Sequence, residues 1–185
     1  MDGRREEEAI ILDFLQHGYP FDTRPSHIKT PIAQAMGTTN FTLLELVPRK
    51  EVFLQPLEHV YIGDDARDKI HHVNGKILHK KLTQTARSQL SHVVAQLVEE
   101  KASFFITFFN KAQPLNLRVH SLELLPGVGK KHMLEILAAR EERPFESFDD
   151  LKARVKSLPD PKKTIVNRIL SELEGIEKHV LFVRL

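Results

Sequence analysis

The amino-acid sequence predicts an α+β protein in which a small OB-like β-barrel is followed by an all-α helix-hairpin-helix domain. Short apolar runs separated by turn residues fill residues 31–82, which is the pattern of closely spaced strands. In residues 83–114 the apolar positions recur with a helical instead of an alternating period. Residues 115–185 then contain a Gly-Val-Gly turn that leads into an apolar helical pattern. We therefore predict an N-terminal segment, a barrel, connecting helices and a helical hairpin domain, in that order.

Length and composition exclude several classes of protein. A chain of 185 residues, of which 41% are hydrophobic, is long enough to bury a core. It has no cysteine, which excludes disulfides, thiol nucleophiles and cysteine-ligated zinc, and its ten His residues are dispersed except for His71-His72. We therefore expect no metal and no cofactor. No apolar run approaches the ~18 residues of a membrane span, and the acidic N-terminus lacks the apolar stretch of a signal peptide, which predicts a cytoplasmic protein without membrane contact.

Charge is distributed unevenly along the chain. Residues 1–100 carry 12 Lys and Arg against 14 Asp and Glu, whereas residues 101–185 carry 15 against 11. The net charge of +2 therefore conceals a basic C-terminal part, which is the better candidate for contact with a polyanion. An excess of this size is also ordinary for a solvated surface, so charge alone does not decide the function.

Residues 1–30 are predicted to hold an N-terminal helix and a loop rich in Pro and Gly. The apolar stretch Glu8–Leu15 is the candidate helix. Gly18, Pro20 and Pro25 follow it, and these residues favour turns and interrupt regular elements. The barrel is therefore expected to begin only at residue 31.

Residues 31–82 are predicted to form the OB-like barrel. The candidate strands, separated by turn residues, are Ile32–Met36, Phe41–Val47, Val52–Leu54, Val60–Ile62 and Val73–Leu78. Asn74-Gly75 is a strong signal for a tight hairpin because both residues tolerate positive φ, and it would place His71-His72 near the hairpin tip. About five short strands in about fifty residues favour closure into a small barrel, since closure removes sheet edges. Other small barrels fit the same pattern.

Residues 83–114 are predicted to be connecting helices. Thr83 is a suitable N-cap for a helix with one apolar stripe. The members of the stripe are Ala86, Leu90, Val93, Val94, Leu97 and Val98. Phe104, Phe105, Phe108 and Phe109 follow at helical spacing, and we interpret them as core residues and not as base-stacking aromatics.

Residues 115–185 contain two similar helical hairpins. The stretch from Leu125 to Leu137 aligns with the stretch from Leu158 to Leu170, 33 positions later. The second copy has no glycine in its turn, but Asp160-Pro161 is a good helix start, because Asp caps the helix and Pro suits its first position. We predict that the first hairpin binds a ligand, that the degenerate second hairpin serves packing, and that a C-terminal strand follows.

The first hairpin carries the strongest functional signal. The stretch Leu122–Leu137, LELLPGVGKKHMLEIL, resembles the helix-hairpin-helix consensus. Gly127 can close the first helix with a left-handed conformation, Val128 can anchor the turn, and Gly129 leaves room for a phosphate beside the free amides of the next helix. The predicted nucleic-acid-binding residues are Pro126, Gly127, Val128, Gly129, Lys130, Lys131 and His132. Some modules of this kind serve only packing or protein docking.

The barrel supplies a weaker candidate for a second nucleic-acid contact. Aromatic residues could stack on bases while cations follow the backbone, as in an OB-type groove. The candidates are Phe41, Arg49, Lys50, Tyr61, Lys76, Lys80 and Lys81. Phe41 is just as well explained as a core residue.

An enzyme is one alternative, because DNA glycosylases also contain a helix-hairpin-helix. Their catalytic Asp follows the hairpin by some twenty residues, and Asp149 and Asp150 have a comparable spacing. The context Phe-Glu-Ser-Phe-Asp-Asp-Leu instead predicts a helix start, with Ser147 as the cap and Asp150 as its reciprocal partner. No nucleotide-binding loop, nucleophile elbow or paired-carboxylate cluster is present, so we predict a protein that is not an enzyme.

Over essentially its full length the chain resembles an uncharacterised, mainly archaeal family, domain of unknown function six-five-five. The shared stretches are Pro31–Gln34, Asn40–Glu45, Val47–Lys50, Val60–Gly63, Phe108–Pro114, the first hairpin, Lys152–Lys163 and Leu181–Arg184. The resemblance implies an OB-like barrel joined to a helix-hairpin-helix region. It also implies that relatives are encoded beside genes for a ribosomal protein, an RNA polymerase subunit and a ribosomal-RNA dimethyltransferase, which favours RNA as the ligand. The family has no agreed catalytic residues to transfer.

We therefore expect a non-catalytic nucleic-acid-binding protein that grips the phosphate backbone, with RNA favoured over DNA and a role in ribosome biogenesis or translation among ribosome assembly components. One alternative is a DNA-binding accessory factor in repair or transcription, because this hairpin type most often meets duplex DNA. The other is a protein-interaction scaffold in which the hairpin serves only packing. Competition between duplex DNA and structured RNA separates the first two, and binding that is insensitive to Gly127 and Gly129 favours the third.

Overall fold

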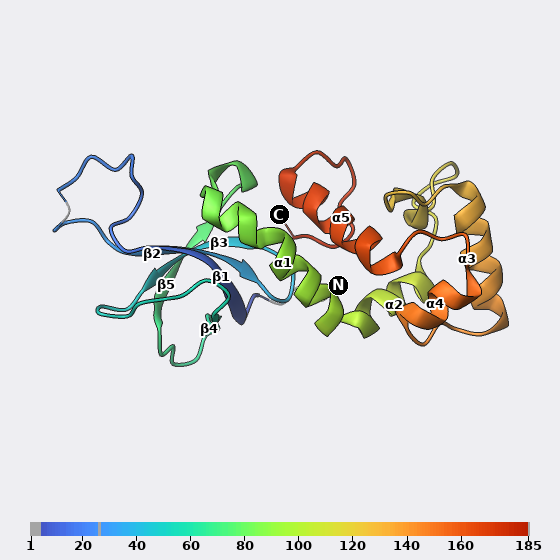
Figure 1. The fold of residues 1–185 in the computed structure, drawn as a ribbon, viewed down its shortest axis with the longest axis horizontal. Helices are drawn as coiled ribbons and strands as arrows, with labels where there is room; N and C mark the ends of the chain where they lie inside the picture. Colours follow the sequence, from blue (N-terminus) through green and yellow to red (C-terminus); the bar gives the residue numbers. More distant parts are fainter. Residues whose placement is uncertain (1–4, 26, 185) are drawn as a thin grey trace. The chain divides into compact units, whose positions relative to one another are not determined.

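The computed structural model describes residues 5–25 and 27–184, and it divides into two compact units (Figure 1). The first, here called the sheet unit, comprises Met1–Val93 and Glu172–Leu185. The second, here called the helical unit, comprises Val94–Ser171. Each division falls within a helix, which therefore contributes to both units. The chain is thus a mixed α+β protein, as the sequence predicts.

The sheet unit is built on five antiparallel strands. They are β1 (Glu8–Leu15), β2 (Ile32–Gly37), β3 (Leu43–Pro48), β4 (His59–Tyr61) and β5 (Ile70–Lys76). Their order in the sheet is β4-β1-β2-β3-β5, so β1, β2 and β3 lie inside and β4 and β5 form the edges. The sheet curls, as Figure 1 shows, but the two edge strands do not pair with each other. The described strands therefore form a half-barrel.

The predicted N-terminal helix is wrong, because Glu8–Leu15 forms strand β1. Ala9, Ile10, Ile11 and Leu12 are all fully buried, so this strand is covered on both faces. A strand buried on both faces shows a continuous apolar run instead of an alternating one, and periodicity does not distinguish such a short run from a buried helix. Pairing with β2 on one side and β4 on the other satisfies its backbone.

Two further predictions about the sheet are wrong. Val52–Leu54 is not a strand, although Leu54 is buried in the core of the sheet unit. Asn74-Gly75 does not form a hairpin turn but lies within β5, where the pairing shifts by one residue. Val73 pairs with Leu46 and Gly75 with Glu45, so Asn74 is the extra residue of a β-bulge. Gly75 has φ 152°, so the positive φ that favours a turn serves the bulge instead.

A short 3₁₀ helix, η1 (His79–Lys81), and α1 (Gln84–Glu100) follow the sheet, and α2 (Ala102–Lys111) comes next. Thr83 caps α1 as predicted, since the amide of Ala86 donates to Thr83 Oγ1 at 3.0 Å. The predicted apolar stripe of α1 is buried throughout. In α2, Phe105 and Phe109 are fully buried, which confirms them as core residues, whereas Phe104 is 41% exposed.

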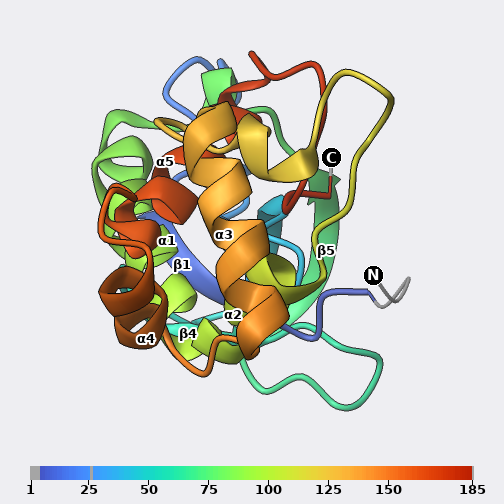
Figure 2. The ribbon, with the colours of Figure 1, turned by 90° about the vertical axis from the view of Figure 1, so that its right-hand side faces the viewer.

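The rest of the helical unit consists of a 3₁₀ turn, η2 (Ser121–Leu124), and three helices, α3 (Lys130–Glu142), α4 (Phe148–Arg154) and α5 (Pro161–Glu174). Figure 2 views it with α3 foremost. None of the helices in the described ranges has the length and apolar content needed to span a membrane. Where the sequence predicts the first helix of the first hairpin, the structure has the single 3₁₀ turn η2, so it does not confirm a helix-hairpin-helix domain.

The predicted C-terminal strand is wrong, because residues 181–184 pair with a side chain instead of a strand. The carboxylate of Glu172, in the sheet unit, accepts the amides of Leu181 at 2.7 Å and of Phe182 and Val183 at 2.9 Å. Phe182 and Val183 are buried. A buried carboxylate that accepts several amides satisfies the backbone that a strand neighbour would otherwise satisfy.

Candidate functional site

The predicted binding turn is here called the first turn and comprises residues 125–129, between η2 and α3. The 3₁₀ turn before it is capped by His120, whose Nδ1 accepts the amide of Leu122 at 3.1 Å. Glu123 completes the cap by accepting the amide of His120 at 2.9 Å. Burial, together with the nearby positive charge of Arg140, lowers the pKa of His120, which keeps the imidazole neutral as an acceptor. The entry to the first turn is therefore fixed by local contacts.

The middle of the first turn is anchored by its neighbours. Gly127 has φ +77°, the left-handed conformation that the sequence predicts for it. A Cβ on Gly127 would lie 3.2 Å from Cγ of Pro159, so the two turns of the helical unit touch here. Val128 is buried, and its amide donates to the carbonyl of Leu125 at 3.0 Å. The structure therefore confirms the conformation of Gly127 and the inward position of Val128.

Gly129 occupies a different environment from Gly127. Its φ of −94° and ψ of −177° are extended values that any residue adopts. A Cβ placed on Gly129 would meet no heavy atom within 4 Å in the described part of the chain. Neither the backbone nor the packing of this structure therefore requires a glycine at this position.

Helix α3 begins directly after Gly129 and presents open amides. The first helical hydrogen bond runs from the amide of Met133 to the carbonyl of Gly129 at 3.0 Å. The first amides of any helix lack an intrahelical acceptor, and no protein acceptor is assigned to those of Lys130, Lys131 and His132 within the described residues. Together with the helix dipole they form a partial positive charge at the surface. This arrangement suits an anion.

The cations at the start of α3 are exposed. Lys130 and Lys131 are both exposed, and Lys131 Nζ lies 4.0 Å from the carboxylate of Glu135, a distance at the limit of an ion pair. His132 is half-buried, and its Nδ1 lies 3.4 Å from the amide nitrogen of Gly129. The two lysines are therefore free to add positive charge beside the open amides, while His132 turns toward its own backbone.

The second turn, residues 158–160, precedes α5 and is closed by its own side chain. Asp160 Oδ1 accepts the amide of Lys163 at 3.1 Å, and Pro161 is the first residue of the helix, as predicted. Lys162 Nζ lies 2.6 Å from a carboxylate oxygen of Glu99, and this hydrogen bond raises the pKa of Lys162. The carboxylate of Asp160 therefore already occupies the position at the start of α5 that an anion would take.

The candidates for a second contact do not form one surface. Phe41 is 1% exposed with φ 56°, so it is a core residue and the prediction that it contacts nucleic acid is wrong. Arg49 donates from Nε to the carbonyl of Arg67 at 2.8 Å, while Lys50, Lys80 and Lys81 are exposed. Tyr61 and Lys76 alone among the candidates line a common groove, of about 760 Å³.

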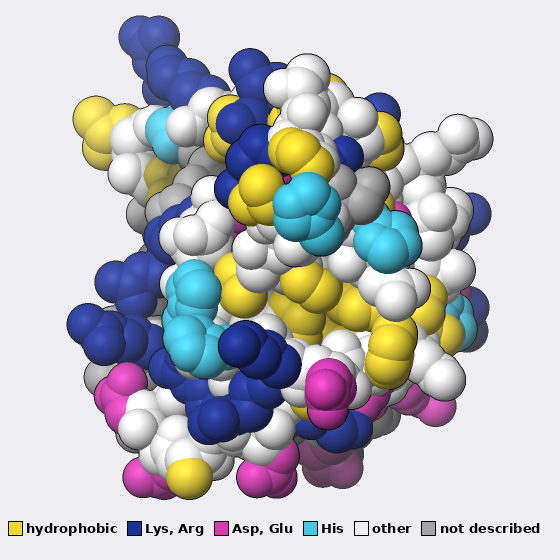
Figure 3. All heavy atoms as spheres, turned by 90° about the vertical axis from the view of Figure 1, so that its left-hand side faces the viewer, with side chains coloured by type: hydrophobic (Ala, Val, Ile, Leu, Met, Phe, Trp, Pro, Cys, Tyr) yellow, Lys and Arg dark blue, Asp and Glu magenta, His cyan; other side chains and the backbone are white. Residues whose placement is uncertain are grey.

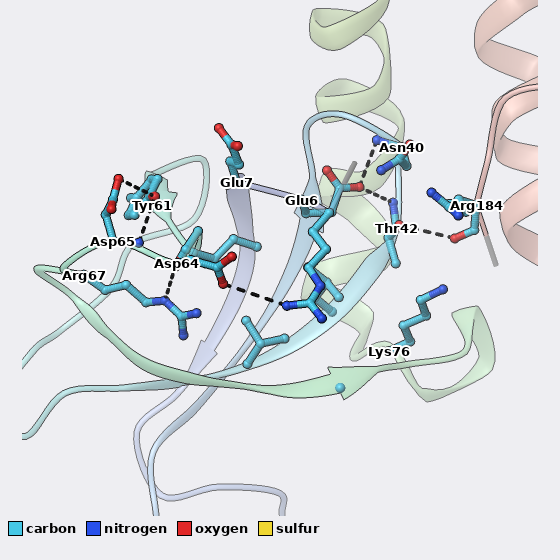
Figure 4. Close-up of a pocket in the computed structure, with 16 residues that line it drawn as sticks. Glu6, Glu7, Asn40, Thr42, Tyr61, Asp64, Asp65, Arg67, Lys76 and Arg184 are labelled. Atoms are coloured by element: carbon cyan, nitrogen blue, oxygen red, sulfur yellow. Dashed lines mark hydrogen bonds and ion pairs between the residues drawn. The ribbon is translucent and has the colours of Figure 1, made fainter. Parts of the chain in front are cut away.

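This groove lies in the sheet unit and is shown in Figure 4. Its charged lining residues include Arg5, Asp64, Asp65 and Arg184, which sequence reasoning missed. They come from both ends of the chain and from the loop between β4 and β5, and no local motif marks them. Their convergence follows only from the three-dimensional fold.

The sheet unit also exposes large apolar side chains. Phe21 is 79% and Phe53 65% exposed. Tyr19 stacks on Phe21 with ring centroids 4.9 Å apart, and Phe14 meets Phe53 edge-on at 6.3 Å. Figure 3 shows one face of the molecule where hydrophobic side chains gather in a band beside His and Lys or Arg side chains. Exposed apolar area of this kind is a feature of docking surfaces.

The residues weighed for glycosylase chemistry belong to a helix cap. Ser147 Oγ accepts the amide of Asp150 at 3.0 Å, which confirms the predicted cap of α4. The reciprocal contact is wrong, because the Asp150 carboxylate accepts the amide of Glu146 at 3.1 Å instead of that of Ser147. Arg143, at 3.0 Å, and Arg154, at 3.4 Å, also pair with this carboxylate. The Glu146 amide and these guanidinium groups lower the pKa of Asp150. Among the described residues no group of three or more His, Asp or Glu is placed to hold a metal ion.

Comparisons with known proteins agree on one family. Residues 5–184 match the model of a family described as protein of unknown function (DUF655). The chain is 40% identical over 181 residues to the uncharacterized protein MJ0038 of Methanocaldococcus jannaschii. The aligned region covers 97% of this chain and 80% of that protein. It is similar, with a TM-score of 0.88 and 40% identity, to the crystal structure of Af1531 from Archaeoglobus fulgidus, described as family-model DUF655, over 97% of this chain and all of that one.

Proposed function

The chain belongs to DUF655, a family of proteins of unknown function, and we propose that it is a non-catalytic nucleic-acid-binding protein. The first turn and the opening amides of α3 bind backbone phosphates, in the manner of a shortened helix-hairpin-helix. The curled sheet is an OB-like barrel left open at one seam. The protein acts in the cytoplasm.

Gly129 is the observation that carries this proposal. A glycine costs conformational entropy on folding, and at this position the structure draws no benefit from it, since both the conformation and the space would accept a side chain. A glycine at this position is explained if a ligand from outside the chain approaches the backbone here. A phosphate that accepts hydrogen bonds from the amides of α3 would occupy that position.

The surroundings of Gly129 favour an anion over other ligands. The N-terminus of a helix carries the equivalent of roughly half a positive charge, and the exposed Lys130 and Lys131 add two charges beside it. The second turn supports the same chemistry, because there the carboxylate of Asp160 accepts an amide at the start of α5. An oxyanion is thus accommodated by this type of turn, and in the first turn it would come from a ligand.

RNA is the preferred ligand in this proposal, with a role in ribosome biogenesis or translation. The support is the resemblance of the chain to a family whose genes neighbour those of the ribosome and of ribosomal-RNA modification. Contacts to phosphates alone read no sequence, so the first turn would supply affinity and orientation but not base specificity. The DNA-binding alternative predicts the same contacts with duplex DNA as the tighter ligand.

The proposal is tested by fluorescence anisotropy with duplex DNA, single-stranded RNA and structured ribosomal RNA at two salt concentrations. We compare wild type with Gly129→Ser, which adds a Cβ and a good N-cap without adding charge. The matched control is Asp160→Ser, which places the same residue at the cap of α5. Circular dichroism verifies folding.

We expect Gly129→Ser to weaken binding by about tenfold or more, because one group of backbone contacts is worth at least about 1.4 kcal/mol. Asp160→Ser should stay within about twofold of wild type, and the tightest wild-type ligand identifies RNA or DNA. Equal affinities of the three proteins would remove the first turn from the binding site.

A protein-interaction scaffold is the second candidate function. The observation in its favour is the set of exposed aromatic side chains on the sheet unit, including Phe21 and Phe53. The scaffold function is favoured if wild type binds none of the nucleic acids, since the first turn would then serve packing alone.

A further inference from the structure

The groove of the sheet unit lies where the two edge strands fail to meet. Tyr61 ends β4, while Gly75 and Lys76 end β5, and all three line the groove. The segment before β1 and Arg184 near the C-terminus supply further walls. Its volume of about 760 Å³ lies within the range of small-molecule sites. It is a site separate from the first turn, which belongs to the helical unit.

The walls of this groove are held in place before any ligand arrives. The carboxylate of Glu6 accepts the amides of Thr39 at 2.7 Å, Asn40 at 2.9 Å and Thr42 at 3.3 Å, which fixes the turn between β2 and β3. Arg184 is tied to the same turn, because its amide donates to the carbonyl of Asn40 at 3.0 Å and its carbonyl accepts from Thr42 Oγ1 at 3.2 Å. A preformed groove loses little entropy when it binds.

Two cationic side chains line one end of the groove, where the carboxylate of Glu6 accepts the amides of Asn40 and Thr42. Figure 4 shows Lys76 and Arg184 at the same end, beside Thr42 and away from Asp64 and Asp65. Both side chains are exposed, and within the described residues neither has a carboxylate at ion-pair distance. The Glu6 carboxylate is engaged by these backbone amides, so Lys76 and Arg184 remain available to a phosphate or another oxyanion.

The other end combines a fixed aromatic ring with carboxylates. A Cβ on Gly63 would lie 2.2 Å from the Tyr61 hydroxyl oxygen, so the ring lies directly over the Gly63 backbone. The Tyr61 hydroxyl accepts the amide of Asp65 at 3.3 Å, which fixes the ring further. Arg67 donates to the Gly63 carbonyl at 2.7 Å, while among the described residues the ion-pair partner of Asp64 is Arg5, at 3.9 Å. A fixed ring offers a stacking surface, and the carboxylates accept hydrogen bonds from amino groups.

We propose that this groove binds a nucleoside phosphate, with the phosphate against Lys76 and Arg184 and the base against Tyr61. The carboxylates of Asp64 and Asp65 accept hydrogen bonds from amino or ring N–H groups of the base. A ligand with two anionic ends would be repelled by these carboxylates, and a cationic ligand by Lys76 and Arg184. A nucleoside phosphate has an anion at one end, which suits Lys76 and Arg184, and a planar group with donors at the other, which suits Tyr61 and the exposed carboxylates of Asp64 and Asp65. The same chemistry is offered by a free nucleotide and by the terminal nucleotide of a single RNA strand.

The experiment measures binding of the four ribonucleoside 5′-monophosphates, inorganic phosphate and a short 5′-phosphorylated single-stranded RNA by isothermal titration calorimetry. The groove variants are Lys76→Ala/Arg184→Ala, Tyr61→Leu and Tyr61→Phe. The matched control for the first is Lys111→Ala/Lys178→Ala, which removes two exposed lysines outside the groove. Circular dichroism accompanies each variant.

We expect at least one nucleotide to bind more tightly than inorganic phosphate. Lys76→Ala/Arg184→Ala and Tyr61→Leu should each weaken the affinity for this nucleotide about tenfold or more. The control and Tyr61→Phe should retain the wild-type affinity. Tighter binding of the RNA assigns the site to a strand end, and tighter binding of a monophosphate assigns it to a free nucleotide. Absence of nucleotide binding, affinity no greater than that of inorganic phosphate, or equal affinities of the groove variants and wild type would overturn the proposal.

Gly129→Ser separates this outcome from that of the proposed function. It should leave binding of the nucleotide in the groove unchanged while it weakens binding of longer nucleic acids. If the groove variants have no effect and Gly129→Ser still weakens RNA binding, the groove proposal fails and the proposed function stands. If Gly129→Ser has no effect and the groove variants do, the proposed function fails and the groove proposal stands.

Discussion

The first and second turns of the helical unit are similar in sequence, but they differ in whether a side chain caps the helix that follows. Both begin with a buried leucine and a proline, Leu125-Pro126 and Leu158-Pro159, and both lead into a helix of 13 or 14 residues. In the second turn the carboxylate of Asp160 accepts an amide at the start of α5. In the first turn Gly129 stands at the N-cap and contributes no side chain.

The two copies therefore satisfy the first amides of their helices in different ways. A helix start needs acceptors for its first amides, and these are supplied by a capping side chain, by water or by a ligand. The second copy supplies its own acceptor, and it therefore needs no partner. The first copy starts its helix two alignment positions later and leaves the acceptor to come from outside.

The largest expected effect comes from giving the first turn the carboxylate of the second. Gly129→Asp should lower affinity for nucleic acid about 30-fold or more, roughly 2 kcal/mol, because the carboxylate takes the amides and repels phosphate. Stability should stay the same or rise by about 1 kcal/mol, because Asp is a good N-cap. Anisotropy titration and urea unfolding measure the two quantities. Loss of affinity together with a loss of stability would mean that the variant acts through misfolding.

The two glycines of the first turn should differ in their effect on stability. Gly127→Ala is expected to cost about 1–2 kcal/mol, because alanine is strained at positive φ and its Cβ would press on the ring of Pro159. Gly129→Ala should cost less than about 1 kcal/mol, since only the weaker N-cap preference of alanine opposes it. Urea unfolding of both variants checks this. Equal costs would contradict the assignment of Gly127 to the fold and of Gly129 to binding.

The smallest effect is expected from removing the cap of the second turn. Asp160→Ala should destabilise the protein by about 1 kcal/mol, because an amide of α5 loses its acceptor. Its affinity for nucleic acid should stay within about twofold of wild type. Thermal unfolding and anisotropy are the measurements. A large change in affinity would show that the second turn also contacts the ligand, and the comparison would then break down.

Local features of the fold were predictable from the sequence, and features set by distant contacts were not. Thr83, Ser147 and Asp160 all accept the predicted capping hydrogen bonds, because a cap depends on residues within one helical turn. Strand β1 was predicted as a helix, because its burial on both faces depends on segments far along the chain. The bulge at Asn74 was predicted as a turn, because the local preference for positive φ is the same in both.

The same division applies to the candidate sites. The conformation of Gly127 and the burial of Val128 follow from the Gly-Val-Gly pattern itself. The groove could not be predicted, because Arg5 and Arg184 converge from opposite ends of the chain. Phe41 illustrates the opposite error, since an aromatic residue beside turn signals turned out to be one of the most buried residues of the sheet unit.

The most direct test of the central claim is a ¹H–¹⁵N NMR titration of the full chain with a short structured RNA. We expect the largest amide shifts at Lys130, Lys131 and His132, where the phosphate would accept hydrogen bonds. The corresponding amides at the start of α5, from Lys162 to Thr164, should change little, because Asp160 already closes that turn. If the RNA binds and the amides of the first turn do not shift, or shift no more than those of the second, the first turn is not the phosphate site.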